Sequence, residues 1–321
     1  MPGTTLGTAV AVSESTSPEP PVAAPETLVS EERLVAEVSE RPAATHARTP
    51  RAGRNLPAAI AVGLSLVAVL FGCVYVLPVL FTPVVGIAVV IATLEVANAL
   101  EGARLRVPVI PLLVASVGVV VSTWQYGASG LLVSTIVGAI VLIVWRTTEA
   151  TGLMALRDTV AGIFALLWVP FMASFTILLM AQPNGANKVM FALVVPIMND
   201  TCGYALGVLF GRHPMAPSIS PKKTWEGFAG SLIGGVAAAG LIGHVWLPEV
   251  GFWWGLAFGA VMVVVSTVGD LSESLLKRDL RIKDMGQLLP GHGGMMDRLD
   301  SMLLTAPTVF ILLAIVEAIN G

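Results

Sequence analysis

Charged residues are scarce in this sequence of 321 residues, of which only 12% are Asp, Glu, Lys or Arg. Hydrophobic residues make up 55%, and the mean hydropathy is +0.83. Ordinary soluble domains carry about 25% charged residues. A single soluble domain could not bury this much apolar surface, so the composition predicts a polytopic membrane protein. We expect no nucleic-acid partner.

Cysteine is also rare, and its placement excludes two classes of site. Cys73 and Cys202 both lie inside apolar runs and form no C-x-x-C pair, so neither a disulfide framework nor a zinc site is indicated. The first 54 residues lack the apolar core of a secretory signal, so we expect the first spanning helix to direct insertion. Residues 1–40 hold seven Glu and one Arg among Pro, Ser, Thr and Ala. This composition predicts that residues 1–54 form a disordered cytoplasmic tail.

What the remaining chain does contain is a series of long apolar runs. They lie at 55–71, 73–98, 107–123, 128–146, 157–181, 187–211, 225–246, 252–270 and 301–319. Continuous rather than alternating runs favour helices over a β-barrel. The predicted fold is therefore all-α, with about nine transmembrane helices in a catalytic domain over 55–321. We divide it into N-terminal spans (55–156) and the spans that carry the motifs below (157–321).

The basic residues predict the orientation of these spans. If the N-terminus is cytoplasmic, all Lys and Arg residues except Arg33 and Lys188 fall at the borders of the cytoplasmic face. The opposite loops 124–130 and 244–251 hold neither Lys nor Arg. We therefore expect a protein of the cell membrane whose N-terminus and polar segments face the cytoplasm.

Two predicted helix ends carry polar residues at helical spacing. The first set, at the end of the eighth span, is Asp270, Ser274, Lys277 and Arg281. The second set, at the start of the ninth span, is Asp297, Asp300 and Ser301. Residues with these spacings share one helix face, so carboxylates from two helices are expected to converge at the membrane border.

A charged loop that only signals topology is the simpler alternative, but unpaired carboxylates at embedded helix ends are costly without a cation. Oxygen ligands without Cys or paired His suit Mg²⁺, in one or two ions.

Two further segments indicate phosphate binding. "PGHGG" (290–294) offers backbone amides that can approach a phosphate closely, although no G-K-[ST] follows as in a Walker A loop. His292 within it is a candidate contact to phosphate or to a metal-bound water, whereas a lone loop histidine is more often only solvated. In "SISPKKTWEG" (218–227) we expect Ser220 to cap a helix that begins at Pro221. Lys222 and Lys223 in its first turn would oppose the helix dipole unless an anion binds there.

Asn199 and Asp200 are polar residues inside the sixth span, and an ionisable group at that depth is a functional candidate by default. A polar contact between helices is the alternative. Glu95 and Glu101, near the end of the second span, are weaker candidates of the same kind.

These residues resemble the signature of the phosphatidate cytidylyltransferase family. The matching positions are Ser274, Lys277, Arg278, Lys283, Asp284, Pro290, Gly291, His292, Gly293, Gly294, Asp297, Arg298 and Asp300. "SPKKTWEG" and Asp200 with Tyr204 also match the family pattern. The resemblance covers 199–301, and the chain before residue 157 adds only hydropathy.

The resemblance implies that the chain makes CDP-diacylglycerol and pyrophosphate from CTP and phosphatidic acid at the lipid bilayer. It implies Mg²⁺ as cofactor, held by Asp270, Asp297 and Asp300. The implied catalytic residues are Asp270, Asp297, Lys277 and Arg298. The implied substrate-binding residues are Ser220, Lys222, Lys223, Asp200, Ser274, Arg278, Lys283, Gly291, His292, Gly293 and Gly294.

Three alternatives stay open at this point. The apolar residues that face lipid do not identify which lipid binds. The sequence therefore does not exclude a related membrane cytidylyltransferase or kinase that acts on an isoprenoid lipid. An ion-coupled transporter could use Asp200 and Asp270 as ion sites, but it predicts matched discontinuous helices that the sequence does not show. The small residues of 230–240 allow close helix contacts within the chain or between two copies, which leaves a homodimer open.

Overall fold

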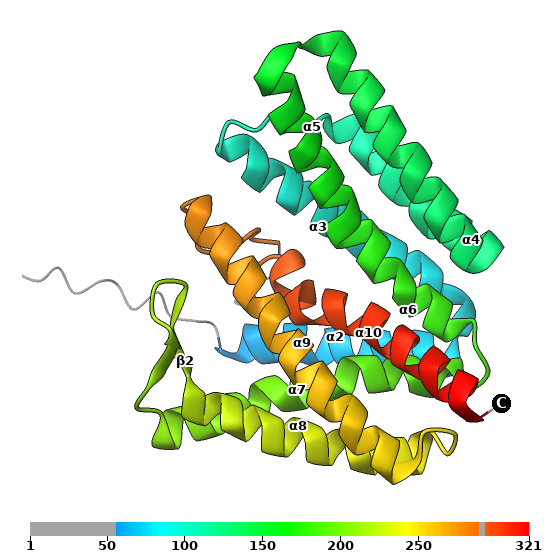
Figure 1. Ribbon diagram of the computed structural model, residues 1–321, viewed down its shortest axis with the longest axis vertical. Coiled ribbons are helices and arrows are strands. Elements are labelled where there is room, and N and C mark those ends of the chain that lie inside the picture. Colours follow the sequence, from blue (N-terminus) through cyan, green and yellow to red (C-terminus); the bar gives the residue numbers. More distant parts are fainter. Residues whose placement is uncertain (1–55, 289–292, 321) are drawn as a thin grey trace, which may run out of the picture. The chain divides into compact units, whose positions relative to one another are not determined.

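The computed structural model describes residues 56–288 and 293–320, and side chains from residue 63 onward. The predicted disorder of residues 1–54 lies outside the described residues. In the described part, all regular structure is helical except for two short strands (Figure 1). The all-α membrane architecture is therefore confirmed in its broad form.

Helices account for the apolar runs. They are α2 (Leu56–Phe71), η1 (Gly72–Val76), η2 (Pro78–Leu80), α3 (Phe81–Gly102), α4 (Val109–Glu149), α5 (Gly152–Leu166), η3 (Leu167–Phe171), α6 (Met172–Met180), α7 (Gly185–Phe210), α8 (Trp225–Trp246), α9 (Gly251–Asp279) and α10 (Met296–Asn320). Within the described residues, seven helical stretches are long and apolar enough to cross a membrane. The predicted count of about nine is not reproduced.

The difference in count has two sources, one in α4 and one in α2. The 41 residues of α4 are interrupted at Gly127, which has φ 61° and ψ −142°. A Cβ on Gly138 would lie 2.9 Å from the Cβ of Ala115, and one on Gly130 would overlap the carbonyl of Ser122. The two arms of α4 are therefore antiparallel, and they correspond to the predicted spans 107–123 and 128–146. The first predicted span corresponds to α2, which at 16 residues is too short to be counted.

Helices α7, α8 and α9 pack closely because small residues line their contacts. A Cβ on Gly230 would lie 2.7 Å from Leu206 in α7, and a Cβ on Gly259 would lie 2.7 Å from Ala239 in α8. Without side chains at these positions, the helix backbones approach closely and gain packing contacts. The small residues of 230–240 thus serve contacts within this chain.

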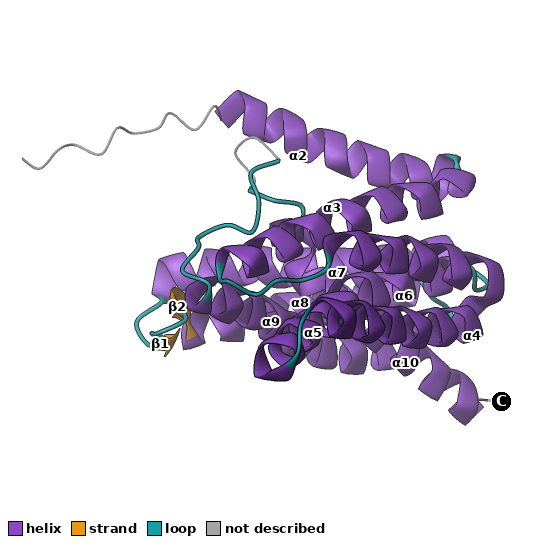
Figure 2. Ribbon diagram, turned by 90° about the horizontal axis from the view of Figure 1, so that it is seen from above, coloured by secondary structure: helices purple, strands orange, loops and turns teal. Residues whose placement is uncertain are grey.

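Two antiparallel strands, β1 (Pro214–Ala216) and β2 (Ser220–Thr224), form a hairpin between α7 and α8 (Figure 2). The helix predicted to start at Ser220 and Pro221 is therefore wrong, since α8 begins at Trp225. Thr224 is the better cap: its backbone is extended, and its Oγ1 accepts a hydrogen bond of 3.1 Å from Gly227 N–H. Glu226 then supplies the negative charge that a first turn favours.

The expected helix face of Asp270, Ser274, Lys277 and Arg281 is also shorter than predicted. Helix α9 ends at Asp279, and Arg281 adopts a left-handed φ of 57°. The N–H of Ile282 donates to the carbonyl of Lys277 at 2.9 Å, and the N–H of Arg281 donates to the carbonyl of Arg278 at 3.0 Å. This is a Schellman C-cap, which turns the chain away before Arg281 can continue the face.

Candidate functional site

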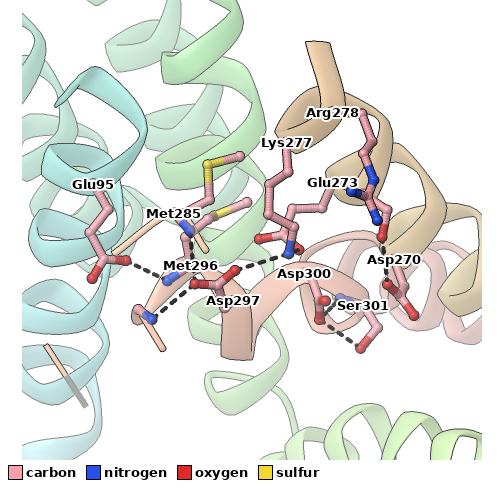
Figure 3. A network of polar contacts seen from close by, with 12 residues as sticks. Glu95, Asp270, Glu273, Lys277, Arg278, Met285, Met296, Asp297, Asp300 and Ser301 are labelled. Carbon is pink, nitrogen blue, oxygen red and sulfur yellow. Dashed lines mark hydrogen bonds and ion pairs between the residues drawn. The ribbon is translucent and has the colours of Figure 1, made fainter. Parts of the chain in front are cut away.

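The end of α9 and the start of α10 meet at a network of buried charges (Figure 3). The Lys277 ammonium lies 2.5 Å from Oε2 of Glu273 and 2.9 Å from Oδ1 of Asp297. Glu273 has 0% exposure, and its Oε1 has no hydrogen-bond partner within the described residues. Burying an ionised carboxylate is costly unless it is paired. Lys277 therefore neutralises carboxylates from two different helices.

Asp297 also fixes the turn that precedes α10. Its Oδ2 accepts hydrogen bonds of 2.9 Å from the N–H groups of Met285 and Gly294. Gly293 has φ 81°, and a Cβ there would lie 3.1 Å from the same oxygen. The site needs glycine at this position, both for the left-handed backbone and for the close approach of the carboxylate.

Glu95 reaches the same turn from α3. Its Oε1 accepts from the N–H of Met295 at 3.0 Å. Its Oε2 accepts from the N–H of Met296 at 2.8 Å (Figure 3). The sequence marked Glu95 only as a weak candidate, and it did not mark Glu273. A Glu four residues before Lys277 on the same helix was a readable signal for that ion pair. No local signal linked Glu95 to residues about 200 positions later in the chain.

A second group of carboxylates comes from three membrane helices. Asp200 of α7, Asp270 of α9 and Asp300 of α10 lie near enough to one another to repel electrostatically. Asp270 forms an ion pair with Lys223 of β2. Asp300 accepts a 2.6 Å hydrogen bond from the N–H of Ser301. The sequence predicted that Asp270 converges with Asp297 and Asp300, whereas the electrostatic interactions link Asp270 and Asp300 with Asp200 of α7.

The hairpin lies against α9 through two of the predicted substrate-binding residues. Besides the ion pair between Lys223 and Asp270, Nε of Arg278 donates to the carbonyl of Ile219 at 3.1 Å. Lys222 is exposed, while Ser220 is half-buried. Ser274 lies one turn after Asp270, and its hydroxyl donates a long 3.4 Å hydrogen bond to Asp270 Oδ1.

The remaining predicted site residues differ in their exposure, and two of them lie outside the described residues. Lys283 and Arg298 are exposed near the turn, and Gly294 is buried with its amide on Asp297. Gly291 and His292 lie outside the described residues.

The residues fit a divalent cation in chemistry but are not arranged as a closed ligand shell. Within 56–288 and 293–320, no group of three or more His, Cys, Asp and Glu side chains is placed to hold a metal ion. Asp200, Asp270 and Asp300 supply the oxygen donors that Mg²⁺ prefers, and Asp270 already forms an ion pair with Lys223. Asp297 is differently placed, because Lys277 and two backbone amides already use its oxygens.

Comparisons with known proteins agree with the signature. A model of the cytidylyltransferase family matches residues 57–316. A Mycobacterium bovis protein named phosphatidate cytidylyltransferase is 43% identical over 279 residues, which cover 83% of this chain and 91% of that protein. A Mycobacterium leprae protein of the same name is 42% identical over 282 residues, covering 83% and 90%. A Thermotoga maritima protein of that name is 35% identical over 168 residues, covering 51% and 62%. Because the family model spans most of the chain, and relatives match along most of their own length, this chain belongs to the cytidylyltransferase family.

Proposed function

We propose that this enzyme transfers the cytidylyl group of CTP to phosphatidic acid, giving CDP-diacylglycerol and pyrophosphate. The observation that carries the proposal is the match of 83% of the chain to relatives named phosphatidate cytidylyltransferase. The geometry agrees with it: acidic residues of three spanning helices gather beside a basic hairpin. A soluble nucleotide and a membrane lipid can meet only where a spanning protein offers polar groups at the bilayer border.

In the proposed reaction, a phosphate oxygen of phosphatidic acid attacks the α-phosphorus of CTP, the bond to the β-phosphate breaks, and pyrophosphate leaves. No general base is required, because phosphatidic acid is already ionised near neutral pH. Catalysis then consists mainly of positioning and charge stabilisation. We assign phosphate contacts to basic residues of the hairpin, of the end of α9, of the segment after α9 and of the first turn of α10. They are Lys222, Lys223, Lys277, Arg278, Lys283 and Arg298.

We propose Mg²⁺ as the cofactor, in one or two ions, with Asp270, Asp297 and Asp300 as ligands. When bound, such ions offset repulsion between two anionic substrates and stabilise the leaving pyrophosphate. Asp270 and Asp300 interact electrostatically with Asp200. Asp297 holds Lys277 and the turn before α10, so its part includes orienting the basic group that meets phosphate.

We propose that the site faces the cytoplasm in the cell membrane. The supporting observation is that nearly all Lys and Arg residues lie at one set of predicted membrane borders. Asp200 lies ten residues before the end of α7, about 15 Å along the helix axis from that end, and it is exposed. We infer that lipid headgroups approach the acidic group from the side of the bilayer there.

The test is incorporation of labelled CTP into lipid by the purified protein, with and without Mg²⁺. Phosphatidic acid and an isoprenyl phosphate are offered in parallel reactions. We expect labelled CDP-diacylglycerol only with phosphatidic acid and only with Mg²⁺. Label in the isoprenyl product would instead support the related activity on isoprenoid lipids, and no label in either would refute the proposal.

A further inference from the structure

Glu95 is a polar contact between the N-terminal half of the chain and the residues that begin α10. It lies in α3 and is only 9% exposed. Its two carboxylate oxygens accept from the consecutive amides of Met295 and Met296, at the start of α10. The first N–H groups of a helix have no partner within the helix, and they carry its positive dipole end. The Glu95 carboxylate, from another helix, accepts hydrogen bonds from these N–H groups and places a negative charge at the positive end of the dipole.

Two glycines hold the Glu95 carboxylate in one place. A Cβ on Gly286 or on Gly294 would collide with the Glu95 carboxylate, so only hydrogen fits on the side of each residue that faces it. Gly286 directly follows Met285, whose amide binds Asp297, and Gly294 directly precedes Met295, whose amide binds Glu95. The packing therefore leaves this carboxylate little room for another position.

Asp297 depends on the backbone that Glu95 fixes. Met295 and Met296 immediately precede Asp297, and the amide of Gly294 donates to Asp297 Oδ2. The other oxygen of Asp297 holds the Lys277 ammonium at 2.9 Å. A shift of the 294–296 backbone would consequently move both Asp297 and Lys277 relative to the acidic group on α7, α9 and α10.

We propose that Glu95 is a positioning residue for cytidylyl transfer, which acts by fixing Asp297 and Lys277 through the start of α10. This inference rests on the proposed function. A positioning role and a purely structural contact between α3 and α10 predict different results. Loss of a purely structural contact would change the amount or stability of folded protein, whereas loss of a positioning residue lowers kcat in protein that is folded.

The test compares Glu95→Gln with Glu101→Gln, an exposed residue on the same helix. Glutamine keeps the shape but turns one oxygen into an N–H donor that faces a backbone N–H. We expect kcat per folded protein to fall about 10–100-fold in Glu95→Gln, as for other residues that orient a site. KM for phosphatidic acid should stay within about threefold of wild type, because lipid binding is not altered. Glu101→Gln should match wild type.

Two more variants keep the test decisive if Glu95→Gln folds poorly. Glu95→Asp keeps the charge and should recover part of kcat, and Gly286→Ala should lower kcat by displacing the carboxylate while leaving Glu95 in the sequence. The inference is overturned if Glu95→Gln or Gly286→Ala keeps kcat within about twofold, or if activity falls only in step with folded protein. An inactive wild type would overturn the proposed function, whereas an active wild type with unaffected variants would overturn this inference alone.

Discussion

The ammonium of Lys277 lies 2.9 Å from the carboxylate of Asp297 and joins the last turn of α9 to the first turn of α10. The same ammonium pairs with Glu273, which is fully buried. One lysine thus compensates two carboxylates that the fold has removed from water. Because both partners lie in the interior, the loss of either member should cost more than the loss of a surface ion pair.

Lys277→Met should therefore destabilise the protein and abolish transfer. Removing one partner of a buried ion pair leaves an uncompensated charge, at a cost of about 3–5 kcal/mol. Thermal unfolding of the purified protein in detergent should show a clearly lower midpoint than wild type. Lys283→Met, at an exposed lysine, should leave the midpoint unchanged.

A double variant separates the two effects of this change. Lys277→Met with Glu273→Gln removes Lys277 together with one of its two buried partners, so part of the lost stability should return while activity stays lost, because Asp297 keeps its charge without the lysine. Recovery of transfer in the double variant would show that Lys277 contributes only to folding.

Asp297→Asn should lower cytidylyl transfer by about 100-fold or more, with normal membrane insertion. Asparagine can still accept hydrogen bonds from the amides of Met285 and Gly294. It carries no negative charge, so the ion pair with Lys277 is lost. The measurement is labelled CTP incorporation per amount of membrane-inserted protein. Asp279→Asn, at an exposed residue that ends α9, is the matched control. Full activity of Asp297→Asn would remove Asp297 from the site.

The sequence predicted the membrane-spanning helices and the polar faces at the end of α9 and the start of α10 for the same reason: both depend on local spacing. Apolar runs give spanning helices, and the break at Gly127 separates the arms of α4 as the polar stretch 124–130 predicted. Lys277 and Asp297 were placed at two helix ends by helical periodicity, and the fold brings them together.

What the sequence missed depends on contacts between distant segments or on competing local signals. Glu95 acts on amides about 200 residues later, and no periodicity reports such a pair. Ser220 and Pro221 carry a normal signal for a helix start. Pairing of β2 with β1, together with the cap by Thr224, overrides that signal and delays the helix to Trp225.

The basic hairpin should control the requirement for CTP. Lys222→Ala combined with Lys223→Ala should raise KM for CTP about tenfold, because charge-assisted contacts to phosphate are lost. Steady-state kinetics with varied CTP at saturating phosphatidic acid would measure this. Arg157→Ala, at an exposed arginine on α5, should leave KM unchanged. An unaltered CTP requirement in the double variant would place the phosphate contacts elsewhere.

Arg278 should hold the hairpin against α9, since its Nε donates to the carbonyl of Ile219 near the hairpin tip. Loss of this contact in Arg278→Ala lets the hairpin open more often, and proteolysis of a transiently opened segment follows the population of the open form. Trypsin cleavage after Lys222 or Lys223, followed by mass spectrometry, should become roughly three- to tenfold faster than in wild type. Lys283→Ala should leave the cleavage rate at these two sites unchanged. Equal rates in Arg278→Ala and wild type would mean that the ion pair between Lys223 and Asp270 is sufficient to hold the hairpin, and that the Arg278 side chain serves substrate alone.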